Sequence, residues 1–411
     1  MNELTLGRDN LRSHQRIHFL FMNLGHFFDH LLMLVFATVA ALTLAHEWDI
    51  RYANLIPYAT PGFVAFGLFS LPAGWLADRW SREGMMLVFF FGIGLASITT
   101  ALAQTPLQIA VGLFAIGVFA AIYHPVGLAL VVQGRSRTGL PIAVNGVFGN
   151  LGVACAALLA GYLADHSGWR SAFIWPGIVT VAIGIAYGLF LFRTRSGWDE
   201  LKEKSGPAAA NEATEGRQLD RRLLIWIFSI VFFSTAIGSL IFQSTTFALP
   251  KIFDERLSDL SISATLVGRY AFVVFALASI GQVAVGYLLD RFSIKRIFMA
   301  VAAFQVVFFT AMIGRTGDAA LLLSIAFMLV VFGQIPINDV LVGRIAKSEW
   351  RSRAFGLRYI IGFTVMAFAI PLIAWIYARW SFDVLFGVLA VAGACILIAV
   401  TLLPRQLAAK A

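Results

Sequence analysis

Long apolar stretches alternate with short polar breaks along nearly the whole chain. A helix needs roughly 20 apolar residues to cross the hydrocarbon core of a bilayer. Twelve stretches have this character, and we predict a membrane-spanning helix at each of residues 17–45, 55–77, 84–103, 106–132, 140–164, 169–192, 223–248, 263–289, 297–314, 319–345, 354–378 and 382–403. The first stretch is too long for a cleavable signal peptide and carries polar residues, so we expect it to be a span.

The longest polar break separates the sixth stretch from the seventh. It covers residues 193–222, is rich in Ala, Glu, Gly and Lys, and contains Pro207 with little apolar periodicity. Such a composition is typical of a linker. We therefore predict an N-terminal six-helix bundle over residues 1–192, a cytoplasmic linker over 193–222 and a C-terminal six-helix bundle over 223–411.

Lysine and arginine gather in every second polar break. Of the 31 such residues, 23 lie on one side of the predicted membrane, 6 lie on the other, and Arg269 and Arg358 lie inside spans. Loops that remain in the cytoplasm carry an excess of these residues. We therefore predict a multi-pass protein of the bacterial inner membrane with both termini in the cytoplasm.

The composition supports a membrane protein and excludes several other classes. Hydrophobic residues make up 59% of the chain and charged residues 13%, whereas soluble domains have about 45–50% and about 25%. The net charge of +9 does not indicate a nucleic-acid partner, because the basic residues form no single patch. Cys155 and Cys395 fall in apolar spans of different halves, so no disulfide framework is expected.

A short motif occurs once in each half, at an offset of 212 residues. Residues 74–79 read Gly-Trp-Leu-Ala-Asp-Arg after span two, and residues 286–291 read Gly-Tyr-Leu-Leu-Asp-Arg after span eight. We expect the glycine to allow close helix approach, and the charged residues to pair with each other or with helix ends of the other half. The candidate residues of this conformational loop are Gly74, Asp78, Arg79, Arg82, Gly286, Asp290 and Arg291.

The pattern Gly-x-x-x-Asp-Arg-x-x-Arg resembles the loop signature of the major facilitator superfamily (MFS), although Ser81 and Glu83 depart from it. The twelve spans, the repeat and the central linker resemble that family too, over nearly the whole chain. The resemblance implies an all-α membrane protein of two six-helix bundles with pseudo-twofold symmetry. It also implies that the bundles rock around a central cavity lined mainly by spans one, four, seven and ten.

Within the superfamily, Tyr123-His124-Pro125 in span four and residues 149–152 and 24–26 look similar to the fosmidomycin-resistance-like branch of drug exporters. The arginine of the drug-antiporter signature is absent near Leu113. The resemblance implies efflux of small molecules.

Span one carries His26, Asp29 and His30 near the middle of the membrane. Spacings of three and four residues place them on one face of a helix. Charged groups inside spans are costly and often mark ion pathways, and imidazole changes its charge near neutral pH. We predict that Asp29, with His26 or His30, takes and releases a coupling proton. The alternative is a hydrogen-bonded cluster with a structural role.

Further polar residues lie on spans that the resemblance assigns to the cavity. His124 lies just before Pro125 in span four, where a substrate contact and a structural role are both open. The candidate cavity residues are Tyr123, His124, Gln243, Asn338 and Arg269. Arg269 lies near the outer end of span eight, where it either extends outward to the interface or attracts an anionic substrate.

Asp339 in span ten and Arg358 in span eleven lie at matching depths in neighbouring antiparallel spans. An unpaired buried charge is expensive, so we predict an ion pair between them. The pair is either a fixed structural contact or a cytoplasmic gate that breaks in one state.

Together these features predict a secondary active transporter that works by alternating access, exports amphipathic or organic-anion compounds and is coupled to protons. The alternative is proton-coupled uptake of a small organic acid held by Arg269 or His124. Metal transport through His26, Asp29, His30 and His124 is a further alternative. We expect a monomer in the lipid bilayer with a small-molecule substrate and protons as partners, and neither enzymatic activity, a cofactor, a bound metal nor a nucleic-acid partner.

Overall fold

The computed structural model describes residues 3–133, 135, 139–204, 221–260, 263–345 and 348–404, and no strand occurs among them. In the first half the helices are α1 (Glu3–Val39), η1 (Ala40–Leu44), α2 (Ala45–Glu47), α3 (Tyr52–Leu55), η2 (Ile56–Ala59), α4 (Thr60–Leu68), α5 (Ser70–Arg79), α6 (Arg82–Thr100), α7 (Pro106–Ala120), η3 (Tyr123–Gly127), α8 (Leu128–Val132), α9 (Gly139–Ser167) and α10 (Ser171–Lys204). In the second half they are α11 (Arg221–Arg256), α12 (Ala264–Leu289), α13 (Ile294–Met312), α14 (Gly317–Ile345), α15 (Ser348–Arg379) and α16 (Phe382–Thr401).

Within the described residues, 12 helical segments are long and apolar enough to cross a membrane, one at each predicted span. Several of them begin where a hydroxyl side chain precedes the apolar run. Ser81 Oγ accepts a hydrogen bond from the backbone N–H of Gly84, and Thr105 Oγ1 accepts one from that of Gln108. Such caps satisfy N–H groups that a helix start leaves free, so local sequence sets these boundaries.

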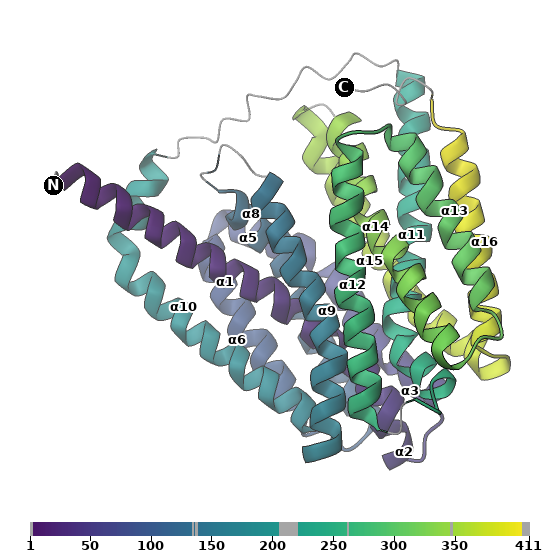
Figure 1. Ribbon diagram of the computed structural model, residues 1–411. Helices are drawn as coiled ribbons and strands as arrows, with labels where there is room; N and C mark the ends of the chain where they lie inside the picture. The colour runs from purple at the N-terminus through teal and green to yellow at the C-terminus, as the bar shows by residue number, and fades with distance from the viewer. Residues whose placement is uncertain are drawn as a thin grey trace.

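The helices form two bundles, α1–α10 and α11–α16, which lie side by side in Figure 1. They meet where α9 packs along α12 and where α4 packs along α15. We call the side on which α10 ends and α11 begins the linker face, and the side that carries α2 and α3 the opposite face. In Figure 1 the helices α1 and α10 lean away from α12 toward the linker face.

Small residues allow the two bundles to approach closely between α9 and α12. A Cβ atom at Gly268 would lie 2.5 Å from the carbonyl oxygen of Ala157, and one at Gly161 would clash with the carbonyl of Ala264. In a membrane, helix association depends on such close backbone packing because lipid is as apolar as the helix surfaces.

Asp165 joins the bundles at the opposite face. Its carboxylate, at the end of α9, accepts hydrogen bonds from the backbone N–H of Ala264 at 3.3 Å and from the N–H and hydroxyl of Thr265, both at 2.6 Å. Ala264 and Thr265 begin α12 in the other bundle. A carboxylate at a helix N-terminus both caps free N–H groups and interacts favourably with the helix dipole.

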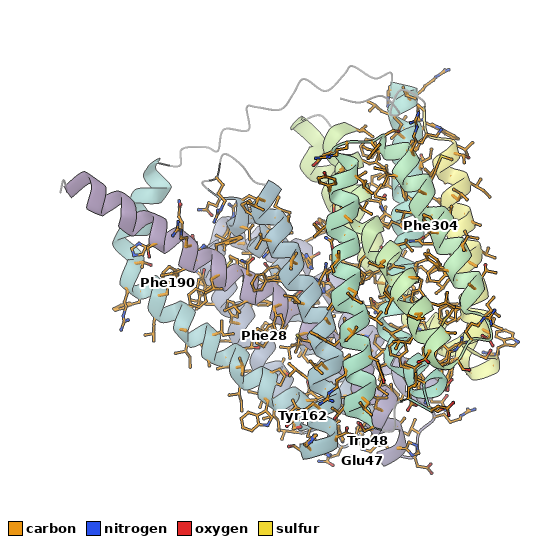
Figure 2. The ribbon with its side chains drawn as sticks, viewed as in Figure 1. Phe28, Glu47, Trp48, Tyr162, Phe190 and Phe304 are labelled. Carbon is orange, nitrogen blue, oxygen red and sulfur yellow. The ribbon has the colours of Figure 1, made fainter. Side chains whose placement is uncertain are left out.

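The opposite face is also tied within the first bundle. Arg170 pairs with Glu47 at 3.3 Å, and the rings of Trp48 and Trp169 meet edge to face at 5.8 Å. Glu47 and Trp48 lie at the foot of the structure in Figure 2. These contacts connect the end of span one to the start of span six.

Three details differ from the pattern expected from the sequence. Span four is not one regular helix, because a π-helical turn at Tyr123–Gly127 interrupts it around Pro125. Helix α10 continues to Lys204, beyond the expected linker boundary at residue 192. Helix α4 gives way to α5 at Phe69 within span two.

The repeated loop motif behaves differently in the two halves. A Cβ atom at Gly74 would lie 3.2 Å from Pro125, a tight contact that glycine avoids. At Gly286 no atom of the described residues lies within 4 Å of the corresponding position. Asp78 pairs with Arg82 at 2.7 Å, as expected. Arg79 lies over Trp75, and Arg291 over the ring of Tyr287 at 4.0 Å.

Replacing Asp165 with Ala should weaken the contact at the opposite face. Losing such a cap costs about 1 kcal/mol, which corresponds to roughly a fivefold change in the ratio of two states. Spin labels on cysteines at the exposed positions Leu102 and Ile313, in a background without native cysteines, should show a larger population at long distances. The neighbouring change His166→Ala should leave the distances unchanged, and an unaltered distribution in Asp165→Ala would contradict the assignment.

Candidate functional site

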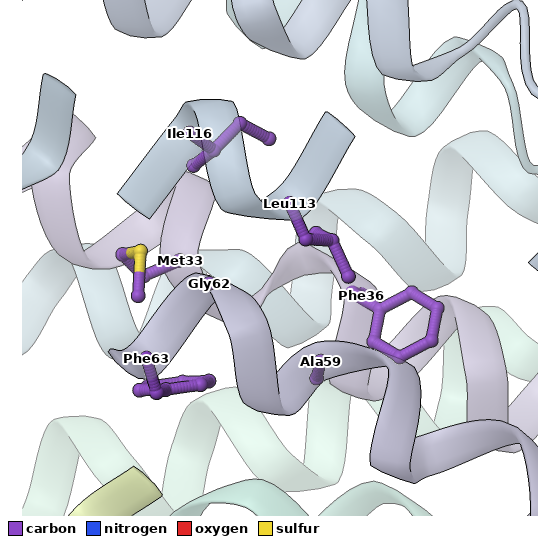
Figure 3. A pocket seen from close by; sticks show the side chains of 7 residues that line it. All are labelled: Met33, Phe36, Ala59, Gly62, Phe63, Leu113 and Ile116. Carbon is purple, nitrogen blue, oxygen red and sulfur yellow. The ribbon is translucent and has the colours of Figure 1, made fainter. Parts of the chain in front are cut away.

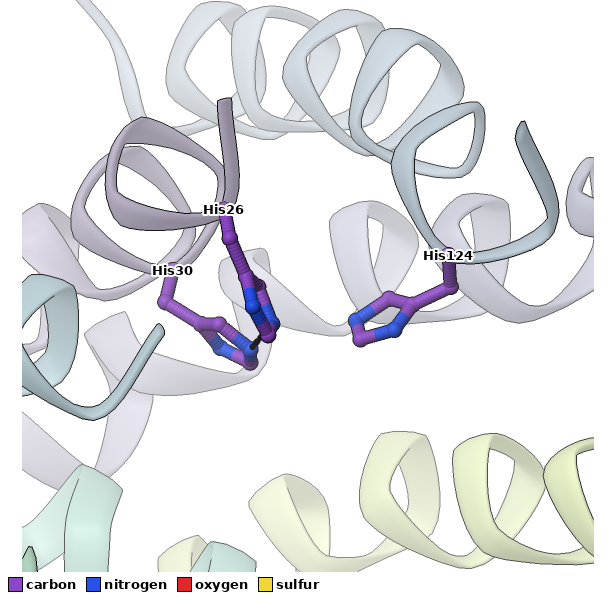
Figure 4. A group of neighbouring side chains, drawn as sticks. All are labelled: His26, His30 and His124. Atoms are coloured by element: carbon purple, nitrogen blue, oxygen red, sulfur yellow. Dashed lines mark hydrogen bonds between the residues drawn. The ribbon is translucent and has the colours of Figure 1, made fainter. Parts of the chain in front are cut away.

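Three histidines meet inside the first bundle. His26 and His30 lie on α1, and His124 reaches them from η3, as Figure 4 shows. One ring nitrogen from each lies within 4.8 Å of the other two. The π-helical turn before α8 displaces the backbone of span four and turns His124 toward α1, so the break near Pro125 positions this side chain.

His26 is held firmly by its surroundings. Its Nδ1–H donates to the backbone oxygen of Asn145 at 2.7 Å, and its ring stacks on Tyr123 with centroids 4.8 Å apart. Because a carbonyl oxygen only accepts, neutral His26 presents the lone pair of Nε2, which lies 3.2 Å from Nε2 of His30. Because Nε2 of His26 accepts, Nε2–H of His30 is the donor of this hydrogen bond. Gly149 leaves room for the His26 ring, since a Cβ at Gly149 would lie 2.6 Å from Nε2 of His26.

Asp29 is fully buried, at 0% exposure, and among the described residues neither carboxylate oxygen has a hydrogen-bond partner. Its closest titratable neighbour is His124, whose Nε2 lies 3.6 Å from Oδ2. The ring nitrogens of His124 also have no hydrogen-bond partner in the described part of the chain. His124, rather than His26 or His30, thus lies within 4 Å of the Asp29 carboxylate, while His26 and His30 hydrogen-bond each other.

His124 also contacts the second bundle. Its ring lies 5.6 Å from that of Phe363 and 6.2 Å from that of Tyr359, both on α15, and 5.5 Å from Phe66 on α4. Phe66 and Phe363 meet at 4.6 Å across the bundle boundary. We call these four residues the aromatic junction. Through His124, the aromatic junction lies one side chain away from the buried carboxylate of Asp29.

Next to this junction Nη1 of Arg358 contacts Oδ1 of Asp339, the two residues that the sequence predicts to pair. The two helices are antiparallel neighbours, which brings the matching depths together as the sequence indicated. The guanidinium carbon of Arg358 lies 5.5 Å from the centre of the Tyr359 ring.

Tyr123 has a structural environment. It is completely buried, its hydroxyl donates to the carbonyl of Met22 at 2.8 Å and accepts from Nδ2 of Asn145 at 2.8 Å. Asn145 in turn donates to Asn23 at 3.0 Å. The network ties spans one, four and five together, so Tyr123 lies behind His26 rather than among the side chains that meet at the bundle boundary.

The remaining cavity candidates are distributed over the second bundle. Gln243 is buried on α11, and its Nε2 has no hydrogen-bond partner among the described residues. Asn338 is buried and accepts from the hydroxyl of Ser234 at 3.2 Å. Both therefore lie within the second bundle, and the structure does not join them to the histidine group.

Arg269 lies outside this central region. It is exposed on α12 and shares a helical face with the exposed apolar residues Val273, Leu277 and Ile280. Such a face is typical of contact with lipid, where a long cationic side chain extends toward the interface. Its proposed role in holding a substrate is not supported by this position.

Two further polar contacts were not assigned a role in the site from the sequence. Asn150 donates to Gln282, which connects α9 with α12 across the bundle boundary. Gln305 donates to Gln334 at 2.7 Å inside the second bundle. The signal for both is an amide inside an apolar run, which predicts helix contacts but not their partners.

A small apolar pocket lies between α1, α4 and α7, shown in Figure 3. Its volume of about 10 Å³ has room for about one water molecule, so it is too small for an organic substrate. The residues around it are Met33, Phe36, Ala59, Gly62, Phe63, Leu113 and Ile116.

His26, His30 and His124 have the donor atoms for a transition metal, since imidazole suits zinc, copper, iron and nickel. The hydrogen bond between His26 and His30, however, satisfies their facing nitrogens without an ion. The arrangement suits the movement of protons at least as directly as it suits metal binding.

Comparison with known families identifies this architecture. The family model described as Major Facilitator Superfamily matches residues 22–313 and 231–410. The chain belongs to this family. It is therefore a transporter rather than an enzyme, built of two six-helix bundles.

Relatives and solved structures agree with this membership. The chain is 22% identical over 376 residues to the 4-hydroxybenzoate transporter PcaK of Pseudomonas aeruginosa, covering 84% of this chain and 82% of that protein. It is 27% identical over 146 residues to the gallate transporter of Pseudomonas putida, covering 35% and 32%. A crystal structure of a POT family transporter superposes with a TM-score of 0.74 at 12% identity, covering 95% of this chain and 96% of the other.

Tyr123→Phe should lower stability while leaving transport intact. The change removes a buried hydroxyl that donates to Met22 and accepts from Asn145, and such hydrogen bonds contribute about 0.5–1.5 kcal/mol each. The thermal midpoint of purified protein should fall by a few degrees, with an unchanged KM in proteoliposomes. A raised KM with an unchanged midpoint would instead place Tyr123 in the substrate path.

Arg358→Asp should reduce the yield of folded protein, because it places two carboxylates together inside the bundle. Breaking a buried pair costs about 3–5 kcal/mol, reduced here because Asp339 is 40% exposed. Adding Asp339→Arg should restore the yield in size-exclusion chromatography. A double variant as poorly folded as the single one would contradict direct pairing.

Proposed function

We propose that this protein is a proton-coupled secondary active transporter of small organic anions, aromatic carboxylates in particular, that works by alternating access in the bacterial inner membrane. The observation that carries the proposal is the buried carboxylate of Asp29, which lacks a hydrogen-bond partner among the described residues and lies 3.6 Å from His124. His124 in turn contacts both bundles.

A proton at this site has a large energetic effect. An ionised carboxylate in a low-dielectric interior is costly unless it is paired. A proton on Asp29 neutralises it, and a proton on His124 gives it a partner. The titratable groups around Asp29 are His26 and His30 on α1 and Tyr123 and His124 on η3, with Tyr359 beyond His124 on α15.

The substrate class is supported by the relatives and by the aromatic junction. Three kinds of relative are described as transporters of 4-hydroxybenzoate, gallate and niacin, while others are described as a probable sulfoacetate transporter, a nitrite extrusion protein and a multidrug resistance protein. The rings at the bundle boundary come from both halves, and stacked or edge-to-face contacts suit an aromatic solute.

The linker face is the cytoplasmic face in this proposal, since it carries most of the Lys and Arg residues. The bundles are joined at the opposite face by Asp165. Alternating access requires this contact to break while the linker-face ends approach each other. The halves 1–192 and 223–411 then move as two bodies.

The proton gradient supplies the energy. One proton that moves down a pH difference of one unit yields about 1.4 kcal/mol, enough for roughly tenfold accumulation. In symport the anion enters with protons, and in antiport it leaves as protons enter. The predicted export and its alternative, uptake, differ in this respect alone, and the sign of the gradient that drives accumulation distinguishes them.

Asp29→Asn should abolish accumulation of radiolabelled 4-hydroxybenzoate driven by a pH gradient in proteoliposomes, because the amide cannot take up the coupling proton. Exchange of labelled for unlabelled substrate at equal pH should persist. The matched change Asp318→Asn, at an exposed position on α14, should leave both activities unchanged. Gradient-driven accumulation at the normal rate in Asp29→Asn would show that Asp29 does not carry the coupling proton.

A further inference from the structure

The guanidinium of Arg358 occupies an unusual position beside the aromatic junction. Its side chain is 12% exposed, whereas that of its partner Asp339 is 40% exposed. The carboxylate is therefore the less enclosed partner. Displacing it disturbs less packing than displacing the guanidinium, so Asp339 is the member of the pair that is able to leave.

Arg358 also has donors that Asp339 does not use. The bond to Asp339 comes from Nη1, while Nε is buried and has no hydrogen-bond partner among the described residues. A guanidinium presents its N–H groups as a planar fork that matches a carboxylate in a bidentate arrangement. A buried Nε–H without an acceptor is costly, and a second carboxylate would satisfy it.

An apolar wall for the rest of such a ligand adjoins the guanidinium. Tyr359 and Phe363 stack on one face of α15 with ring centroids 5.8 Å apart, and Phe66 lies 4.6 Å from Phe363. Arg358 is thus a cation at the edge of an aromatic surface formed by both bundles. A planar ring with one carboxylate has the same division into an apolar body and a charged end.

From these contacts we propose that Arg358 binds the carboxylate of the transported anion, while Tyr359, Phe363, Phe66 and His124 contact its ring. When no substrate is present, the carboxylate of Asp339 pairs with the guanidinium of Arg358. The substrate carboxylate displaces Asp339 when it binds. The inference rests on the proposed function, since it concerns how that transporter recognises its substrate.

The arrangement also connects the substrate with the proton site. His124 contacts Tyr359 and Phe363 on one side and lies 3.6 Å from Asp29 on the other. An anion at Arg358 therefore acts on Asp29 through a single intervening side chain. Release of Asp339 removes its contact between α14 and α15 at the same moment, which allows these helices to shift.

The test compares 4-hydroxybenzoate with its neutral analogue 4-hydroxybenzamide, using binding to the purified protein in lipid nanodiscs and counterflow in proteoliposomes. Arg358→Gln should weaken binding of the acid at least tenfold and abolish the preference for the acid over the amide. Asp339→Asn should strengthen binding of the acid several-fold, because the competing carboxylate is gone. Arg358→Lys, which keeps the charge but loses the fork, should fall between wild type and Arg358→Gln.

Arg379→Gln provides the matched control, since Arg379 lies on the same helix over the ring of Trp375 at 5.1 Å. It should bind both compounds as the wild type does. The thermal midpoint of each variant shows whether it folds. If Arg358→Gln does not fold, the affinity of Asp339→Asn for the acid decides whether Asp339 competes with the substrate for Arg358.

Two results would overturn the inference and are distinguishable from a failure of the proposed function. If the wild type transports the acid and Arg358→Gln binds it equally well, Arg358 does not bind the carboxylate of the acid. A fixed structural pair predicts that Asp339→Asn loses stability and binds the acid no more tightly. If wild type neither binds nor exchanges 4-hydroxybenzoate, gallate or niacin, the proposed substrate class fails, and this inference fails with it.

Discussion

The interior of a bilayer offers no water, so each polar group there has to find its partner inside the protein. Most buried polar groups of the first bundle satisfy this constraint. Tyr123, Asn145 and His26 form a continuous network in which donors meet acceptors. Asp29 and His124 do not satisfy it: their charge-bearing atoms face each other, and among the described residues neither side chain has a hydrogen bond. A proton or a bound ion is what completes such a pair, and the network around it holds the pair in place.

The pair of Asp29 and His124 lies close to the boundary between the two bundles. His124 lies at the boundary, where rings of α4 and α15 meet, and Arg358 with Asp339 lies on the other side of the same rings. In the proposed mechanism, charge at Asp29 and His124 acts across the aromatic junction on the contact between α14 and α15. At the opposite face, the carboxylate of Asp165 caps a helix of the partner bundle. Tight backbone packing between α9 and α12 joins the two bundles along their boundary.

The spans followed from hydropathy, because helix length and apolar composition are local properties that the membrane imposes. The Asp339–Arg358 pair also followed, since a short connection fixes the relative depth of neighbouring antiparallel spans. Periodicity placed His26, Asp29 and His30 on one face but did not reveal that the histidines bind each other while Asp29 meets His124. That choice depends on the π-helical turn at Tyr123–Gly127 and on Gly149, which leaves room for the ring. Asp165 was missed because a carboxylate near a loop gives no sequence signal of a helix end 100 residues away. The sequence left open whether Arg269 faces the cavity, because that depends on which face of α12 is exposed.

In the proposed mechanism the buried carboxylate of Asp29 exchanges a proton as substrate binds. Adding 4-hydroxybenzoate to purified protein in weakly buffered solution with a pH indicator measures this exchange. We expect a change of up to about one bound proton per bound anion in wild type, which disappears in Asp29→Asn although that variant still binds the anion. An equal proton signal in wild type and Asp29→Asn would show that Asp29 does not exchange the proton.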